Sequence, residues 1–159
     1  HDPLFAKEGE MQNPQRMLRA MEVVLSTGQS ILQFRKGEKR KRNFNIIKIG
    51  LDLPREELYH RINHRVDVMM ENGLLEEAKS IYALRHLNAL QTVGYRELFV
   101  FFDGNSTLEQ AIDKVKQNSR HYAKRQLTWF KQDAGMKWLH PANTSQIQDY
   151  ILQQLQPEL

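Results

Sequence analysis

Residues 106–131, STLEQAIDKVKQNSRHYAKRQLTWFK, contain neither Gly nor Pro and predict one long helix. Ser106 and Glu109 have the spacing of a capping box, in which a hydroxyl and a carboxylate each accept a hydrogen bond from a free backbone N–H group. At about 100° per residue, the apolar residues fall on one arc and predict a stripe that faces the core. That arc consists of Leu108, Ala111, Ile112, Val115, Tyr122, Ala123, Trp129 and Phe130.

Cations lie beside this arc. Between Thr107 and Lys131 there are six basic and two acidic residues, so the stretch has the same net charge as the whole chain, +4. Like charges four residues apart repel by about 0.2–0.5 kcal/mol per pair, and an anionic partner would turn that repulsion into attraction. A simply solvated basic face is the alternative. The cations are Lys114, Lys116, Arg120, Lys124, Arg125 and Lys131.

Gln126 lies inside the apolar arc of the same predicted helix. A buried amide without a partner costs about 1–3 kcal/mol, so we expect Gln126 to reach a specific polar group. A backbone carbonyl of a neighbouring helix is one candidate. Trp129 and Trp138 are expected in the core rather than in a base-stacking surface.

Length and composition limit the possible classes of protein. A chain of 159 residues is one domain or part of a larger one, and its positive charge favours a polyanionic partner. The absence of cysteine excludes disulfides, a thiolate nucleophile and a Cys-based zinc site. No apolar run approaches the ~18 residues that span a bilayer, and the polar N-terminus does not resemble a signal peptide. The expected location is therefore the cytoplasm, without a membrane partner.

The other predicted elements are mostly helices. Asn13-Pro14 and Gly28 have the residue types of a helix start and a helix end. Pro54 precedes a second helix, and two more are expected over Leu74–Leu84 and from Asn143-Thr144 to Leu155. Residues 35–42, RKGEKRKR, have no apolar anchor and indicate a solvated loop, with electrostatic steering of RNA as the alternative.

Asn43–Leu53, NFNIIKIGLDL, is predicted to be a buried strand that Gly50 ends. One strand needs partners, and Met136–Leu139 is the only other strand candidate in the sequence. We therefore predict a mainly α fold with one or two strands, which is a fragment of a larger α/β domain. A self-sufficient helical module would have no use for such a strand.

Arg61 and Arg65 lie four residues apart in the predicted helix after Pro54. Two guanidinium groups at this spacing suit a phosphate or diphosphate, although two surface arginines give the same pattern. His60 and His64 have the same spacing and could contribute to a zinc site, but no third ligand is near them in the sequence. No metal site is therefore predicted in this chain.

The sequence also resembles the tRNA dimethylallyltransferases, from about Asn13 to Leu139. The most specific block is NSRHYAKRQLTWF, residues 118–130, with GYREL upstream at residues 94–98. These enzymes transfer a dimethylallyl group from dimethylallyl diphosphate to the exocyclic N6 of the adenosine beside the anticodon. The resemblance implies a fragment of a P-loop-type α/β domain with part of its helical insertion. Residues 1–42 would be the end of that insertion and a basic loop, and 43–159 the C-terminal helical part of the catalytic domain.

The resemblance implies tRNA contacts at three segments, Gln15–Arg19, Gln91–Arg96 and Lys124–Lys131. They comprise Gln15, Arg16, Met17, Leu18 and Arg19; Gln91, Thr92, Val93, Gly94, Tyr95 and Arg96; and Lys124, Arg125, Gln126, Leu127, Thr128, Trp129, Phe130 and Lys131. With the family in view, Arg61 and Arg65 become diphosphate-facing candidates, and Arg120 becomes a possible anion contact. The family often has Arg where Lys131 stands, and Lys lacks the bidentate fork of Arg.

The diphosphate cradle of the family does not occur here. Its P-loop motif, GxxxxGK[ST], is absent from the sequence, and the expected general base belongs to the same missing part. We therefore predict no catalytic residue in this chain, no transferase activity for it alone, and Mg²⁺ only in the full-length enzyme. Two alternatives remain at this point, a stand-alone basic helical module that binds nucleic acid and a helical protein–protein interaction domain.

Overall fold

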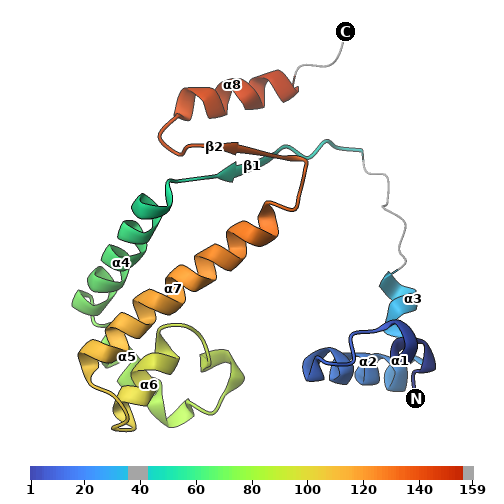
Figure 1. Ribbon diagram of the computed structural model, residues 1–159, viewed down its shortest axis with the longest axis horizontal. Coiled ribbons are helices and arrows are strands. Elements are labelled where there is room, and N and C mark those ends of the chain that lie inside the picture. Colours follow the sequence, from blue (N-terminus) through green and yellow to red (C-terminus); the bar gives the residue numbers. More distant parts are fainter. Residues whose placement is uncertain (36–42, 156–159) are drawn as a thin grey trace. The chain divides into compact units, whose positions relative to one another are not determined.

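The computed structural model describes residues 1–35 and 43–155, and the chain divides into an N-terminal unit, His1–Asn45, and a C-terminal unit, Ile46–Leu159. Figure 1 shows the elements of each unit. The predicted basic loop, residues 35–42, lies outside the described residues except for Arg35. The division of the sequence into an insertion part and a catalytic part stays a prediction.

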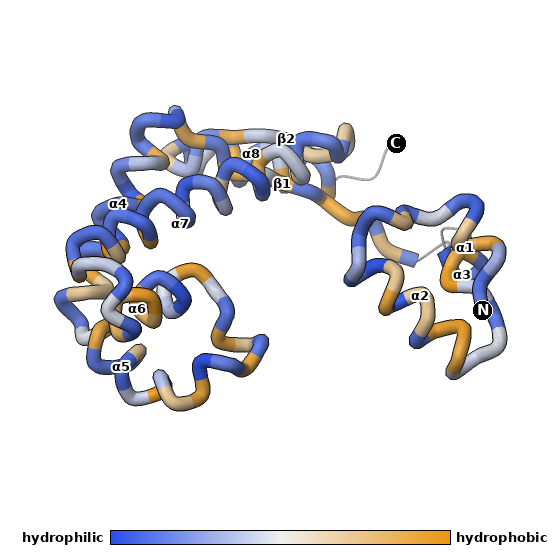
Figure 2. The backbone as a smooth tube through the Cα atoms, turned by 60° about the horizontal axis from the view of Figure 1, so that its bottom comes forward, coloured by the Kyte–Doolittle hydropathy of each residue, from blue (hydrophilic) through white to orange (hydrophobic). Residues whose placement is uncertain are grey.

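Three short helices form the N-terminal unit: α1 (Pro3–Glu8), α2 (Pro14–Thr27) and α3 (Ile31–Arg35). The predicted bounds of α2 are confirmed, because Asn13 Oδ1 accepts the Arg16 N–H at 3.2 Å and Gly28 ends the helix with a φ of 71°. Helix α1 was not predicted from the sequence. Asp2 caps it and Phe5 is buried. Leu18, Met21 and Leu25 of α2 are exposed, and Figure 2 shows hydrophobic residues in orange along this helix.

The C-terminal unit is also mainly helical, and this confirms the predicted class. Its elements are β1 (Lys48–Leu51), α4 (Arg55–Glu71), α5 (Leu74–Ile81), the 3-10 turns η1 (Tyr82–Leu84) and η2 (Asn88–Leu90), α6 (Tyr95–Phe102), α7 (Leu108–Phe130), β2 (Met136–Leu139) and α8 (Thr144–Leu155). Helices α4 and α7 pack side by side, and α5 and α6 pack near one end of this pair (Figure 1).

The two strands are parallel, and Gly50 pairs with Trp138 in the register. The predicted strand over Asn43–Leu53 is therefore too long, and the expectation that Gly50 ends it is wrong. A Cβ atom on Gly50 would lie 2.5 Å from the Trp138 ring, so glycine is required by the closeness of that ring. Ile46 and Leu51 stay exposed beside this pair, as expected of a sheet that lacks neighbouring strands.

The main core lies where α5, α6 and α7 meet. Its buried residues are Leu74, Ala78, Leu98, Phe99 and Ala111. Leu98 is completely buried at 0% exposure. Around it, Tyr82 contacts Phe99 and Phe102 with ring centroids 5.7 and 5.4 Å apart. This core fixes α6, and with it the N-terminal half of α7, in one arrangement.

Helix α7 begins one residue later than predicted, and its cap is Thr107 rather than Ser106. Thr107 Oγ1 accepts the Gln110 N–H at 3.2 Å, and Gln110 Oε1 accepts the Thr107 N–H at 3.0 Å. The extended backbone of Thr107 sets this register, because an N-cap residue has non-helical angles. The Ser106 hydroxyl is instead buried and has no hydrogen-bond partner among the described residues.

Only the first half of the predicted apolar arc on α7 is core. Ala111 and Val115 are each 2% exposed, but Tyr122 is 52%, Trp129 67% and Phe130 39% exposed. The expected burial is wrong for these three aromatic residues, and Trp129 is not a core residue. The physical reason is length: α7 extends beyond α5 and α6, so its C-terminal half lacks their cover.

Candidate nucleic-acid interface

Exposed cations and aromatic side chains lie close together on the C-terminal half of α7. Lys124 and Arg125 are exposed, and the Arg125 guanidinium lies 5.8 Å from the centre of the Tyr122 ring. Trp129 lies within the next turn and contacts Phe130 edge-on, with ring centroids 4.9 Å apart. A hollow of about 530 Å³ is lined here by His121, Lys124, Arg125, Thr128, Trp129 and Gln132. Such a surface offers charge to phosphates and a ring face to an unstacked base.

The other cations of α7 that were candidates for an anion have partners inside the chain. Lys116 Nζ lies 2.5 Å from an Asp67 carboxylate oxygen, and Lys131 Nζ lies 3.1 Å from Asp52 Oδ2. Arg120 donates to Asn63 Oδ1 at 2.5 Å and lies 5.9 Å from the Tyr59 ring centre. The predicted continuous basic row is therefore interrupted. Within residues 1–35 and 43–155, neither Lys124 nor Arg125 forms an ion pair.

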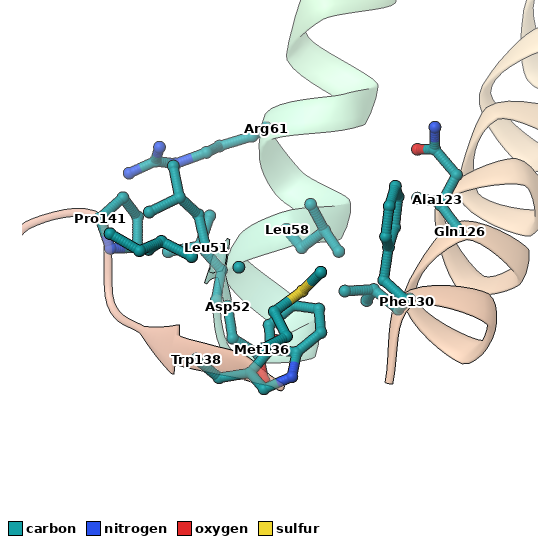
Figure 3. Close-up of a pocket in the computed structure, with 14 residues that line it drawn as sticks. Leu51, Asp52, Leu58, Arg61, Ala123, Gln126, Phe130, Met136, Trp138 and Pro141 are labelled. Carbon is teal, nitrogen blue, oxygen red and sulfur yellow. The ribbon is translucent and has the colours of Figure 1, made fainter. Parts of the chain in front are cut away.

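Gln126 does not behave as predicted. It is exposed and forms no hydrogen bond within the described part of the chain. Its side chain lies at a pocket of about 460 Å³ between the strands and helices α4 and α7, where Leu58, Phe130, Met136 and Trp138 also lie (Figure 3). The expectation of a buried amide is wrong because Gln126 lies at the edge of an open pocket and no side chain packs over it closely enough to bury it.

Arg61 lies at the same pocket, whereas Arg65 does not line it. The Arg61 guanidinium donates to Glu57 Oε1 at 2.7 Å, one turn earlier in α4. Arg65 is exposed. The predicted diphosphate role of these two arginines stays a prediction, and the structure shows that Arg61 already has a carboxylate partner that a ligand would have to displace.

The segment Gln91–Arg96 comprises the turn that leads into α6 and the first two residues of that helix, Tyr95 and Arg96. Gly94 has a φ of 108°, an angle that residues other than glycine rarely adopt. Gln91 donates its amide to the Arg85 carbonyl at 2.6 Å, while the Arg96 side chain is 57% exposed. The segment thus presents Arg96 to solvent from a backbone that hydrogen bonds hold in place.

Glu97 and Asn118 connect this segment to α7, although neither was predicted from the sequence. Glu97 is only 5% exposed; it accepts the Gly94 N–H at 2.8 Å and the Asn118 side-chain amide at 2.6 Å. The spacing of Gly94 and Glu97 is that of a capping box, so a signal for Glu97 was present. Nothing in the sequence indicated that Asn118, 21 residues away, would complete the arrangement.

Tyr95 is held on α5 by its hydroxyl, which donates to Glu77 Oε1. This hydrogen bond raises the pKa of Tyr95, with smaller effects of desolvation and of the Glu77 charge. A raised pKa means that the folded chain holds this proton more tightly than the unfolded chain does. The contribution to stability is therefore present below the ordinary tyrosine pKa of about 10 and is lost as the pH rises through the folded-state pKa.

We expect Glu77→Ala to lower the pKa of Tyr95 toward its ordinary value. An absorbance titration of phenolate formation measures this change, and Tyr95→Phe identifies which part of the signal belongs to Tyr95. An unchanged Tyr95 titration in Glu77→Ala would show that the hydrogen bond does not control this pKa.

The third predicted segment, Gln15–Arg19, lies in the first two turns of α2. Arg16 pairs with Glu10, and Arg19 donates to Glu22 Oε2 at 2.8 Å, so both arginines of the segment have a carboxylate partner. Leu18 is 64% exposed. This segment belongs to the N-terminal unit, so its relation to α7 stays a prediction.

The described residues contain no group of three or more His, Asp or Glu side chains that could hold a metal ion. None of the helices in the described ranges is long and apolar enough to cross a membrane.

These features define a mainly helical chain with a parallel strand pair and an exposed surface of cations and aromatic rings. A family model described as "IPP transferase" matches residues 1–133. The chain therefore belongs to the IPP transferase family. This finding supports the predicted resemblance and does not favour a stand-alone nucleic-acid-binding module.

Individual proteins agree with this assignment. The chain is 51% identical to tRNA dimethylallyltransferase 1 of Phocaeicola vulgatus over 94% of this chain and 50% of that protein, and 49% identical to the same-named protein of Bacteroides fragilis over 94% and 50%. Among solved structures, the full-length tRNA isopentenylpyrophosphate transferase of Bacillus halodurans is 40% identical with a TM-score of 0.66, over 97% of this chain and 49% of that one.

A second solved structure gives the same result. The tRNA delta(2)-isopentenylpyrophosphate transferase of Staphylococcus epidermidis is 37% identical with a TM-score of 0.65, over 97% of this chain and 52% of that one. The chain thus spans about half the length of the relatives that it matches.

Proposed function

We propose that this chain is the tRNA-contacting part of a tRNA dimethylallyltransferase. The whole enzyme would transfer a dimethylallyl group from dimethylallyl diphosphate to the N6 of the adenosine beside the anticodon. The observation that carries the proposal is the exposed cation and aromatic surface on α7, which lies in the part of the chain that the family model matches. The related proteins are named for this activity.

The chemistry of the surface suits a folded RNA. Lys124 and Arg125 are free of ion pairs in the described structure and can replace the counterions of phosphates. The exposed Trp129 ring offers a stacking surface for a base that has left its helix, which is how an enzyme reaches the exocyclic amine of a nucleobase. Arg96, in the first turn of α6, adds a third exposed cation.

The remaining parts of the reaction need groups beyond this surface. A diphosphate leaving group requires neutralisation, and Arg61 and Arg65 are the proposed contributors from α4. We propose that the Mg²⁺ of the whole enzyme is held in the part that carries the P-loop motif, which this sequence lacks. The proposed location of the enzyme is the cytoplasm, where its tRNA substrate is found.

The proposal predicts that this chain binds an anticodon stem-loop RNA with an affinity that falls steeply with salt. Each phosphate contact contributes about 0.7–0.9 to the slope of log K against log salt. Fluorescence anisotropy of a labelled stem-loop between about 50 and 200 mM salt measures both quantities. Binding that does not respond to salt, or no binding at the lowest salt concentration, would contradict the proposal and favour a protein–protein interaction domain.

A further inference from the structure

A buried carboxylate connects two of the proposed RNA-contacting segments. Glu97 is 5% exposed, and both of its oxygens accept hydrogen bonds. One oxygen accepts the Gly94 N–H at 2.8 Å, and the other accepts the Asn118 amide at 2.6 Å. Gly94 is the N-cap of α6, the helix that carries Arg96. Asn118 belongs to α7, the helix that carries Lys124 and Arg125. The two segments are thus joined by one side chain.

The burial of Glu97 makes this connection specific. A charged group away from water needs good hydrogen bonds, and bonds to a charged acceptor are about twice as strong as neutral ones. The bond to Gly94 fixes a backbone with a φ of 108° at the start of α6. The bond to Asn118 then fixes that turn against α7. The neighbouring Arg96 guanidinium lies 3.7 Å from the same Glu97 oxygen that Asn118 contacts, while its side chain remains 57% exposed.

We propose that Glu97 and Asn118 are positioning residues for RNA binding, which hold Gly94 and the start of α6 against α7 so that Arg96 contacts the same RNA as Lys124 and Arg125. This inference rests on the proposed function. The bound partner is the phosphate backbone of a structured RNA, because the fork of an exposed guanidinium matches the oxygens of a phosphate. Neither Glu97 nor Asn118 needs to touch the RNA.

The test is a double-mutant cycle between Asn118 and Arg96. Asn118→Ala removes the hydrogen bond between Glu97 and α7 and leaves the Glu97–Gly94 hydrogen bond in place. We expect it to weaken binding of a labelled anticodon stem-loop by about threefold to tenfold, the worth of one hydrogen bond. Arg96→Ala should also weaken binding and lower the salt slope by about 1. In a chain that already has Asn118→Ala, Arg96→Ala should lower the affinity for the stem-loop much less than it does in the parent chain.

The control is Gln117→Ala, which stands beside Asn118 on α7 and loses only its bond within the helix to Lys114. It should bind the stem-loop like the parent chain. A second pair of variants tests the carboxylate. Glu97→Gln keeps one oxygen that can accept a hydrogen bond and should retain more of the affinity than Glu97→Ala, which removes both acceptors. Circular dichroism of each variant shows whether it remains folded.

The outcomes separate the proposed function from the positioning role. If the parent chain does not bind the stem-loop, the proposed function fails and the positioning role fails with it. If the parent binds and the effects of Asn118→Ala and Arg96→Ala simply multiply, the proposed function stands and the positioning role is overturned. An affinity that Asn118→Ala leaves unchanged also overturns the positioning role. Arg96 and Asn118 both contact the same Glu97 oxygen, so urea unfolding of the same four chains measures their coupling in the fold alone. Coupling in RNA affinity that exceeds this coupling in stability supports the positioning role, and coupling that does not exceed it overturns that role.

Discussion

Replacing Lys124 and Arg125 together by Gln is expected to weaken binding of an anticodon stem-loop by about 10-fold to 100-fold at low salt. Both cations are exposed and without ion pairs in the described structure, so no internal ion pair is lost with them. If each contacts one phosphate, the slope of log K against log salt should fall by about 1.4–1.8 in magnitude. Anisotropy titrations at several salt concentrations measure both effects.

The matched control removes the same amount of charge elsewhere. Lys79→Gln with Lys137→Gln lowers the net charge equally, and both lysines are exposed on the C-terminal unit. This pair should leave the affinity and the slope close to those of the parent chain. Equal losses in the two double variants would mean that overall charge, and not the surface on α7, governs binding, and the proposed interface would be wrong.

Leu98→Ala is expected to have the largest effect on stability of the substitutions considered. Leu98 is completely buried where α5, α6 and α7 meet, so its removal leaves a cavity bounded by these helices. Large-to-small changes of this kind cost about 2–5 kcal/mol, which is a large fraction of the stability of a typical domain. Urea unfolding followed by far-ultraviolet circular dichroism should show a lower midpoint.

Leu152→Ala is the control for this change, because it removes the same atoms from a side chain that is 60% exposed on α8. A substitution at such a position usually changes stability by no more than about 0.5 kcal/mol. If the two variants unfold at the same urea concentration, the junction of α5, α6 and α7 is not the main core. Because α6 carries Arg96, Leu98→Ala should also weaken RNA binding, whereas Leu152→Ala should not.

Some local structure could be predicted because its causes are local. The N-cap Asn13, the C-cap Gly28 and the position of β2 at Met136–Leu139 all depend on neighbouring residues, and each is confirmed. The cap of α7 was misplaced by one residue because Ser106 and Thr107 both have a hydroxyl and a suitable partner three residues on. Two equivalent caps were therefore available, and the packed structure selected one.

Burial on α7 could not be predicted from periodicity. An apolar arc shows which residues lie on one face, but whether that face is covered depends on other helices. Val115 is buried in the half of α7 that packs near α6, whereas Trp129 lies beyond α6 and is exposed (Figure 1). Which cations have partners also depends on neighbouring helices. Lys116 pairs with Asp67 of α4, whereas Lys124, about two turns later, forms no ion pair with a described residue and is available to a partner.

The amino-acid sequence by itself determined the mainly helical class, the long helix at its centre, the cationic character of that helix and the resemblance to the dimethylallyltransferases. These properties depend on residue type and short-range spacing. Only the tertiary structure decided which cations stay available and that Glu97 joins the Gly94 turn to Asn118. Both depend on side chains that are far apart in the sequence and meet only when α4, α6 and α7 pack together.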